Sequence, residues 1–146
     1  MASQLLNFIR FNGLRVMPEH TILVIDDDKL VRWSMSVLLA RAGYTVHEAA
    51  TGADGLAAMQ TCHPDLVLLD ILLPDIDGFG VLRAIRQVRP ELPVLMMTAE
   101  PDSETRKQAL SLGARAHMEK PCDASLLQEA VANALRSASP KSTGNC

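Results

Sequence analysis

The sequence contains few aromatic side chains and few cysteines. Its 146 residues include three phenylalanines, one tyrosine and one tryptophan, so a buried core has to be built from aliphatic side chains. The three cysteines are odd in number and show no C-x-x-C spacing, which argues against a disulfide framework and a zinc site. Reduced cysteines are the rule in the cytoplasm, and we therefore expect a cytoplasmic protein.

Long apolar runs and a surplus of basic side chains are also absent. No segment reaches the roughly 20 apolar residues that a membrane-spanning helix needs, so no membrane span is expected. With 14 Lys and Arg against 17 Asp and Glu, the formal net charge is −3, and no basic surface favours direct contact with nucleic acid. The length suits one domain with a real core.

Short apolar runs alternate with segments of helical periodicity through most of the chain. Runs typical of strands lie at residues 21–25, 44–48, 65–70, 93–97 and 114–118. The segments with helical spacing lie at residues 29–42, 51–61, 79–88, 102–112 and 123–138. This alternation is typical of α/β folds with a parallel sheet. We predict a flavodoxin-like (βα)5 three-layer sandwich with the strand order 2-1-3-4-5.

The segments outside this pattern are short. We expect the domain to span residues 20–138, with an N-terminal extension at 1–19 and a disordered polar tail at 139–146. The extension is apolar with two arginines, but its polar interruptions and the lack of a small-residue cleavage site argue against a signal peptide. It is either an extension outside the domain or an amphipathic helix that docks on a partner or a membrane.

Polar residues stand where four of the predicted strands end. Asp26 and Asp27 follow the first strand, Asp70 ends the third, Thr98 follows the fourth, and Lys120 stands two residues past the fifth. The carboxyl ends of parallel strands meet at one edge of a sheet, and strands one and three flank the point where the strand order reverses. We therefore expect these side chains to converge.

The predicted cluster has a specific chemistry. Three neighbouring carboxylates repel one another, and some of them resist ionisation unless a cation lies between them. Hard oxygen ligands that leave room for water and a phosphate oxygen suit Mg²⁺. Lys120 offers a compact positive charge to a phosphoryl oxygen, and Thr98 offers a hydroxyl donor. This set of groups predicts a site for Mg²⁺-dependent phosphoryl transfer.

Five blocks of sequence resemble the receiver domain of two-component response regulators. They are Ile-Leu-Val-Ile-Asp-Asp-Asp at 22–28, Leu-Leu-Asp-Ile-Leu-Leu-Pro at 68–74, Asp-Gly at 77–78, Met-Met-Thr-Ala at 96–99, and the stretch from Gly-Ala at 113–114 to Lys-Pro at 120–121. The resemblance covers about residues 20–138. It implies a single-domain response regulator, similar to the chemotaxis regulators, that acts as a phosphorylated switch and not as an enzyme.

The resemblance also implies a role for each matching residue of the acidic cluster. Asp70 is the implied phosphoacceptor, which attacks the phosphohistidine of a sensor histidine kinase or a histidine phosphotransfer protein. Asp27 is the implied direct ligand of Mg²⁺, and Asp26 binds the ion mainly through water. Asp70 itself and the backbone carbonyl of Leu72 are the further implied ligands.

The family couples phosphorylation to a change of surface. The resemblance implies that Thr98 hydrogen-bonds the phosphoryl group after transfer and that Lys120 pairs with it. The movement of Thr98 then reshapes the face made by the fourth helix, the fifth strand and the fifth helix. The switch position three before the lysine is usually aromatic, but here it is His117. His117 either fills that position only or makes the output face sensitive to pH as well as to phosphate.

Two other positions carry separate expectations. Leu72, two residues past Asp70, cannot orient an attacking water, whereas Glu100, two residues past Thr98, offers a carboxylate for that purpose, so we expect a persistent phosphoryl group. Trp33 lies beside the inward stripe of the first helix and is expected to be partly buried. An exposed Trp33 would instead indicate a partner-docking face, because tryptophan is enriched at interface hot spots.

Other functions stay open from the sequence alone. A receiver-like scaffold without phosphorylation has no need of the three acids, Thr98 and Lys120. A phosphatase of the haloacid dehalogenase type wants a second acid two residues past Asp70, where Leu72 stands. The chain is also compatible with the receiver fragment of a longer transcriptional regulator. As a single domain, it is expected to act by binding a kinase, a phosphotransfer protein, a target protein or a second copy of itself.

Overall fold

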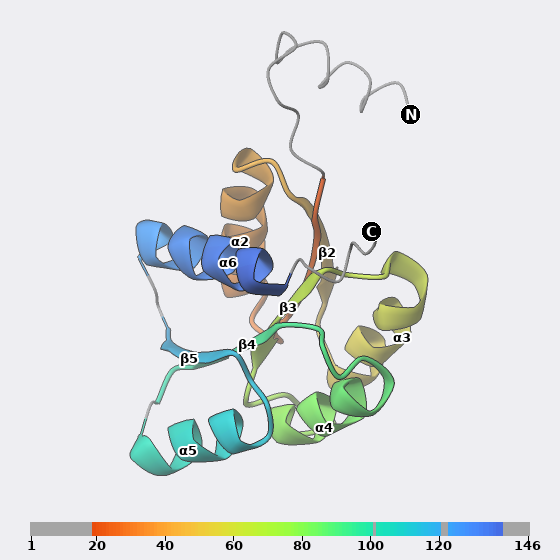
Figure 1. The fold of residues 1–146 in the computed structure, drawn as a ribbon, viewed down its shortest axis with the longest axis vertical. Coiled ribbons are helices and arrows are strands. Elements are labelled where there is room, and N and C mark those ends of the chain that lie inside the picture. The colour runs from red at the N-terminus through yellow and green to blue at the C-terminus, as the bar shows by residue number, and fades with distance from the viewer. Residues whose placement is uncertain (1–18, 101, 121–122, 139–146) are drawn as a thin grey trace, which may run out of the picture.

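A computed structural model describes residues 19–100, 102–120 and 123–138 of the chain (Figure 1). The strands are β1 (Thr21–Ile25), β2 (Thr45–Ala49), β3 (Leu66–Asp70), β4 (Val94–Thr98) and β5 (Ala116–Glu119). They alternate with the helices α2 (Lys29–Arg41), α3 (Gly52–Cys62), α4 (Gly78–Val88), α5 (Ser103–Ser111) and α6 (Ala124–Ala138). All strand pairs are parallel, in the order β2-β1-β3-β4-β5. The predicted flavodoxin-like order is confirmed.

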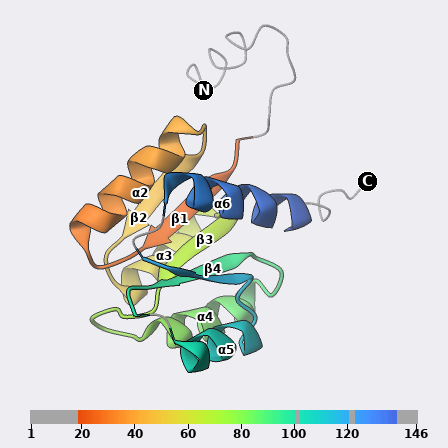
Figure 2. The ribbon, with the colours of Figure 1, turned by 90° about the vertical axis from the view of Figure 1, so that its left-hand side faces the viewer.

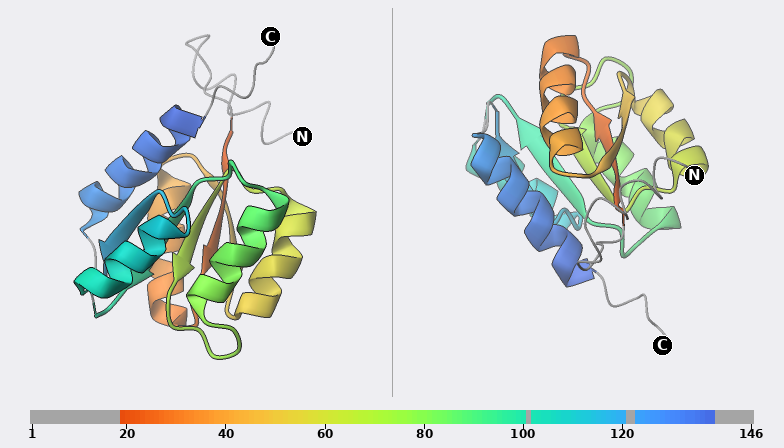
Figure 3. Two further views of the ribbon diagram at one scale, coloured as in Figure 1. Left: turned by 60° about the horizontal axis from the view of Figure 1, so that its bottom comes forward. Right: turned by 90° about the horizontal axis from the view of Figure 1, so that it is seen from above.

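The helices cover both faces of the sheet and make three layers (Figure 2 and Figure 3). Helices α2 and α6 pack on one face, and α3, α4 and α5 pack on the other. Along β1 the side chains alternate between the layers: Leu23 and Ile25 point to α3 and α4, whereas Ile22 and Val24 point to α2 and α6. The two aliphatic cores lie on either side of the sheet, as expected for a parallel sheet.

The central strands are buried at every position, which explains their continuous apolar sequences. All five residues of β3 and all five of β4 are buried. The edge strand β2 is buried only at Ala49, in agreement with the alternation of polar residues in its sequence. Polar side chains on the central strands therefore occur only where the strands end, at Asp70 and Thr98.

Side-chain caps fix where most helices begin. Four residues accept hydrogen bonds from backbone N–H groups in the first turn of the helix that follows, and they are Asp28 for α2, Thr51 for α3, Asp77 for α4 and Asp102 for α5. These caps place the helix starts at the same edge of the sheet as the carboxyl ends of the strands.

Some expectations fall outside the described part of the chain. The predicted tail at 139–146 lies there, and so does the predicted extension apart from Glu19. Among the residues that the structure describes, no helix has both the length and the apolar character needed to cross a bilayer.

The prediction that Trp33 is partly buried is wrong. Its side chain is 58% exposed, and the neighbouring Leu30 is exposed as well. The inner face of α2 is formed by Met35, Ser36 and Leu39, so Trp33 points away from the core. An exposed Trp33 is the case in which the sequence suggests a partner-docking face, because tryptophan is enriched at interface hot spots.

Helix α4 begins in close contact with the end of β3. The N–H of Gly78 donates to the carbonyl of Ile71 at 2.7 Å. A Cβ atom added at Gly78 would lie 2.5 Å from the carbonyl oxygen of Asp70 and 2.6 Å from the Cα of Ile71. Both neighbours are backbone atoms, so only glycine permits this approach.

We predict that Gly78→Ala destabilises the protein by about 1–3 kcal/mol, the usual cost of overpacking. Gly80→Ala, in the same helical turn, is the matched control. A Cβ at Gly80 meets only the Ile76 Cγ2 methyl, at 2.9 Å, and alanine recovers about 0.5–1 kcal/mol of helix propensity there. Urea unfolding of both variants measures the difference. Equal losses in the two variants would contradict the close approach at Gly78.

Candidate functional site

Three carboxylates meet at the carboxyl ends of β1 and β3. Ile25 pairs with Leu69 in the sheet, so the residues that follow them, Asp26 and Asp70, come side by side. One carboxylate oxygen from each of Asp26, Asp27 and Asp70 lies within 4.8 Å of the other two. Asp26 is 1% exposed and Asp70 5% exposed, whereas Asp27 is open to solvent. The structure thus brings together the three acids singled out in the sequence.

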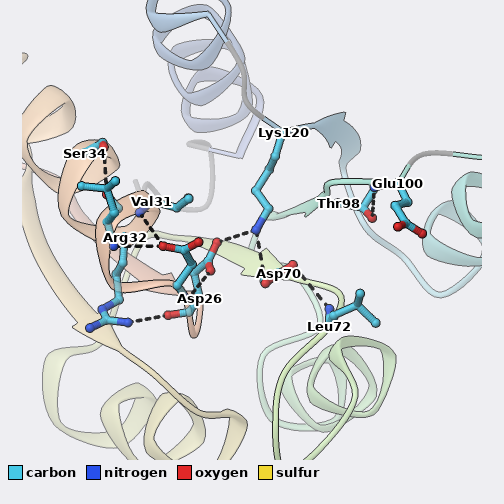
Figure 4. Close-up of polar contacts among 11 residues, drawn as sticks. Asp26, Val31, Arg32, Ser34, Asp70, Leu72, Thr98, Glu100 and Lys120 are labelled. Atoms are coloured by element: carbon cyan, nitrogen blue, oxygen red, sulfur yellow. Dashed lines mark hydrogen bonds and ion pairs between the residues drawn. The ribbon is translucent and has the colours of Figure 1, made fainter.

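Lys120 reaches into this cluster from the end of β5 (Figure 4). Its Nζ donates to Asp26 Oδ2 at 2.8 Å and lies 3.3 Å from Asp70 Oδ2. The backbone N–H of Lys120 donates to the Thr98 carbonyl at 2.7 Å, which ties the β5 end to β4. Burial alone would lower the pKa of Lys120, but its hydrogen bond to Asp26 and the charges of both carboxylates raise it. Lys120 therefore stays charged.

Asp70 is held in an unfavourable environment for a carboxylate. Burial, and then the nearby charge of Asp26, raise the pKa of Asp70 to about 6, although Lys120 and the N–H of Leu72 oppose the shift. The single positive charge of Lys120 thus does not balance the negative charge of the three carboxylates. Two opposite ligands of an octahedral Mg²⁺ lie about 4.2 Å apart, so oxygens spaced like these can share one such ion. The donor set fits Mg²⁺.

The loop between β3 and α4 carries Leu72 past the cluster. The Leu72 N–H lies 3.4 Å from Asp70 Oδ1, while its side chain is 63% exposed. Farther along, Asp75 accepts hydrogen bonds from the N–H groups of Gly52 and Ala53 at 2.8 Å each, at the start of α3. These bonds lower the pKa of Asp75 and hold the loop in place. The backbone of Leu72 is thereby fixed beside Asp70.

Thr98 and Glu100 lie at the end of β4. The Thr98 side chain is buried, and its Oγ1 accepts a hydrogen bond from the Glu100 N–H at 3.1 Å (Figure 4). No hydrogen bond joins Thr98 to Asp70 among the described residues. The hydroxyl is therefore engaged with its own loop in this structure.

His117 is half-buried on β5, where it pairs with Met96 of β4. Its Nε2 is buried and has no hydrogen-bond partner within the described ranges. Burial, followed by the charge of Arg106, lowers the pKa of His117, and Asp102 opposes this shift only in part. The ring is therefore neutral at pH 7.

Arg32 is a neighbour of the cluster that the sequence reasoning missed. Its Nη1 donates to the carbonyl of Asp26 at 2.7 Å, and its Nε pairs with Glu48 Oε1 at 3.0 Å. The available signal was a basic residue one helical turn after the cap Asp28, on the helix that follows the two acids.

Comparison with known proteins agrees with this geometry. Residues 22–132 match the family model of the response regulator receiver domain. The chain is 37% identical to the transcriptional regulatory protein AfsQ1 of Streptomyces coelicolor over 123 aligned residues. These residues make up 84% of this chain and 54% of AfsQ1. It is 39% identical over 116 residues to the DNA-binding transcriptional regulator NtrC of Escherichia coli, covering 80% and 24%. The chain thus spans about half the length of AfsQ1 and a quarter of NtrC.

Solved structures give the same result. A CheY-like response regulator receiver domain protein from Methanospirillum hungatei superposes with a TM-score of 0.79 at 32% identity, covering 83% of this chain and 97% of that one. NtrX from Brucella abortus superposes with a TM-score of 0.81 at 33% identity, covering 85% and 28%. With the family model matched over more than half of its length, this chain belongs to the response regulator receiver domain family of two-component systems.

Proposed function

We propose that Asp70 accepts a phosphoryl group in an Mg²⁺-dependent reaction and that the chain works as a phosphorylation switch. The observation that carries this proposal is the position of the Asp70 carboxylate. It is buried at a strand end, lies 3.3 Å from Lys120 Nζ, and shares a cation-sized space with Asp26 and Asp27. Phosphoryl transfer depends on positioning and charge neutralisation, which Lys120 and a cation held with Asp26 and Asp27 would supply to Asp70.

In the proposed reaction, an Asp70 oxygen attacks the phosphorus of a phosphohistidine. An O–P bond forms, the P–N bond breaks, and its electron pair returns to the imidazole of the donor. Asp26, Asp27, Asp70 and the Leu72 carbonyl would hold Mg²⁺, which neutralises charge on the transferred group. Lys120 moves from the carboxylates to pair with a phosphoryl oxygen.

The proposed switch then passes through β4 and β5. The Thr98 hydroxyl, which accepts from the Glu100 N–H at 3.1 Å, would move and donate a hydrogen bond to the phosphoryl group. The surface made by α5, β5 and α6, on which His117 takes the switch position, changes in consequence. The partners would be a sensor histidine kinase or histidine phosphotransfer protein, and then a target protein or a second copy of the chain. We assign Leu30 and Trp33, exposed on α2 near the acidic cluster, to contact with the donor protein.

A second candidate is a receiver portion of a longer transcriptional regulator. It is favoured by the comparison, because the chain spans about half of AfsQ1 and a quarter of NtrC, which are named as transcriptional regulators. In that case the same phosphorylation at Asp70 would control a further part of the protein, and any DNA contact would belong to that part. Both candidates place the chain in the cytoplasm.

Incubation with acetyl phosphate and Mg²⁺, followed by intact mass measurement, tests the phosphoacceptor. We expect the mass of a single phosphoryl group to be added, and we expect no addition in Asp70→Asn or with a chelator present. Asp65→Asn is the matched control, because Asp65 lies just before the other end of β3, where it accepts a hydrogen bond from the Thr21 N–H at 2.8 Å. No adduct on the wild type would favour a scaffold, and repeated turnover would favour a phosphatase.

The raised pKa of Asp70 predicts a dependence of stability on pH. The folded state holds the Asp70 proton up to about pH 6, whereas the ordinary value is 3.8, so ionisation costs stability as pH rises from about 4 to 6. Without divalent cations at pH 7.5, Asp70→Asn should therefore be more stable than wild type by about 1–3 kcal/mol. The gap should close near pH 4, and Mg²⁺ should narrow it at pH 7.5. Urea unfolding at several pH values measures it, and a gap independent of pH would contradict the assignment.

The lifetime of the phosphoryl group should depend on Leu72. Leu72→Asn supplies an amide that can orient water beside Asp70, and we expect loss of phosphate to accelerate by about tenfold, less than the ~10²-fold of a full general base. The side chain is exposed, so this change does not disturb the core. Leu72→Met is the apolar control. Phosphate release from the phosphorylated protein, followed over time, decides the matter, and equal rates in wild type and Leu72→Asn would refute the expectation.

A further inference from the structure

The turn that carries the acidic residues is held by few contacts. The Asp26 N–H donates to the Ala49 carbonyl at 3.1 Å, and the Asp28 N–H donates to Asp26 Oδ1 at 2.9 Å. The Asp26 carbonyl, which belongs to the peptide that joins Asp26 to Asp27, accepts from Arg32 Nη1 at 2.7 Å. Arg32 therefore holds the peptide immediately before Asp27.

Arg32 is itself fixed from several sides. Its side chain is 14% exposed, and its Nε pairs with Glu48 Oε1 at 3.0 Å. Its backbone N–H donates to the Asp28 carbonyl at 2.9 Å in the first turn of α2. Figure 4 shows the contact of Arg32 with Asp26. Glu48 belongs to the edge strand β2, so the guanidinium links α2, β2 and the turn after β1. A planar fork of donors suits such a double contact, and a lysine cannot reproduce it.

Asp27 has no comparable support of its own. Its carboxylate is exposed, and no hydrogen bond or ion pair to another described residue holds it. Asp26 and Asp70, by contrast, both contact Lys120. The direction of the Asp27 carboxylate therefore depends on the backbone before it. Arg32 fixes that backbone by its hydrogen bond to the carbonyl oxygen of Asp26.

We propose that Arg32, oriented by Glu48, is a positioning residue that aligns the Asp27 carboxylate for Mg²⁺ and so sets the affinity of the site for the ion. This inference rests on the proposed function. Arg32 contacts a carbonyl and leaves the carboxylate oxygens of the cluster free for the metal. Outer contacts of this kind, which orient a ligand without touching the metal, typically change metal affinity by 10–100-fold when removed.

The charge of Arg32 and its geometry predict opposite results. If Arg32 acted only as a nearby positive charge, removing it would strengthen Mg²⁺ binding, because like charges repel. If it acts by position, removing it weakens binding, and so does a change to lysine that keeps the charge but loses the fork. The direction of the change in affinity therefore separates the two roles.

Titration of the full chain with Mg²⁺, followed by the NMR shifts of the amides of residues 26–28, tests the proposal. We expect Arg32→Lys and Arg32→Met to bind Mg²⁺ about tenfold more weakly than wild type, and Glu48→Gln to show a smaller loss. Arg41→Met, an exposed arginine at the far end of the same helix, is the matched control and should bind as wild type. Unchanged affinity in Arg32→Lys, or tighter binding in Arg32→Met, would overturn the proposal.

A second readout separates positioning from general damage. In phosphorylation by acetyl phosphate, the half-saturating Mg²⁺ concentration should rise about tenfold in Arg32→Lys, while the rate at saturating Mg²⁺ stays within about twofold of wild type. A lower rate at saturating Mg²⁺ with an unchanged half-saturating concentration would overturn the proposal. If both Arg32 variants unfold, Glu48→Gln decides, and wild-type affinity in that variant would count against the inference. A wild type that binds no Mg²⁺ would instead refute the proposed function itself.

Discussion

The site depends on an imbalance of charge that the protein cannot correct by itself. Three carboxylates face one ammonium group, and two of the carboxylates are buried. Lys120 is shared between Asp26 and Asp70, yet the pKa of Asp70 stays raised to about 6. A dication held by the three carboxylates would supply the missing positive charge, and the cluster could then accept the negative charge of a phosphoryl group. In the proposed switch, a dication and a phosphoryl group would relieve this repulsion, and a ligand shifts a structure only by such a difference in stabilisation.

The fold gathers the repelling carboxylates at one edge of the sheet, and the packing of the rest of the domain provides the stability to hold them there. Strands β3 and β4 are buried at every position, and aliphatic cores lie on both faces of the sheet. The strand order places β1 beside β3, so the acids after Ile25 and Leu69 cannot avoid each other. The close approach of Gly78 to the backbone of Asp70 and Ile71 packs the start of α4 against the end of β3. Burial of apolar side chains in the two cores thus offsets the cost of burying neighbouring carboxylates at the site.

Features of the fold and the site could be predicted from the sequence where a local pattern combines with the rule that the carboxyl ends of parallel strands meet at one edge. Continuous apolar runs predicted the buried strands, and the rule for parallel sheets predicted that Asp26, Asp27, Asp70 and Lys120 converge. The rotation of α2 was not predictable in the same way. Each residue turns a helix by about 100°, so assigning the inner face to Met35, Ser36 and Leu39 needs the packed structure. The exposure of Trp33 and the reach of Arg32 both follow from that rotation.

The burial of His117 argues against one of the two roles that its residue type suggested, that of a pH sensor near neutrality. A histidine at the switch position suggested sensitivity to pH near neutrality. In the fold, burial and Arg106 lower its pKa, and its Nε2 has no partner to stabilise an added proton among the described residues. At pH 7 the ring is thus a neutral, flat, half-buried group, close in character to the aromatic ring that the family usually places there. Because burial and Arg106 lower the pKa of His117, its environment favours a neutral ring at the switch position over a proton sensor near neutrality.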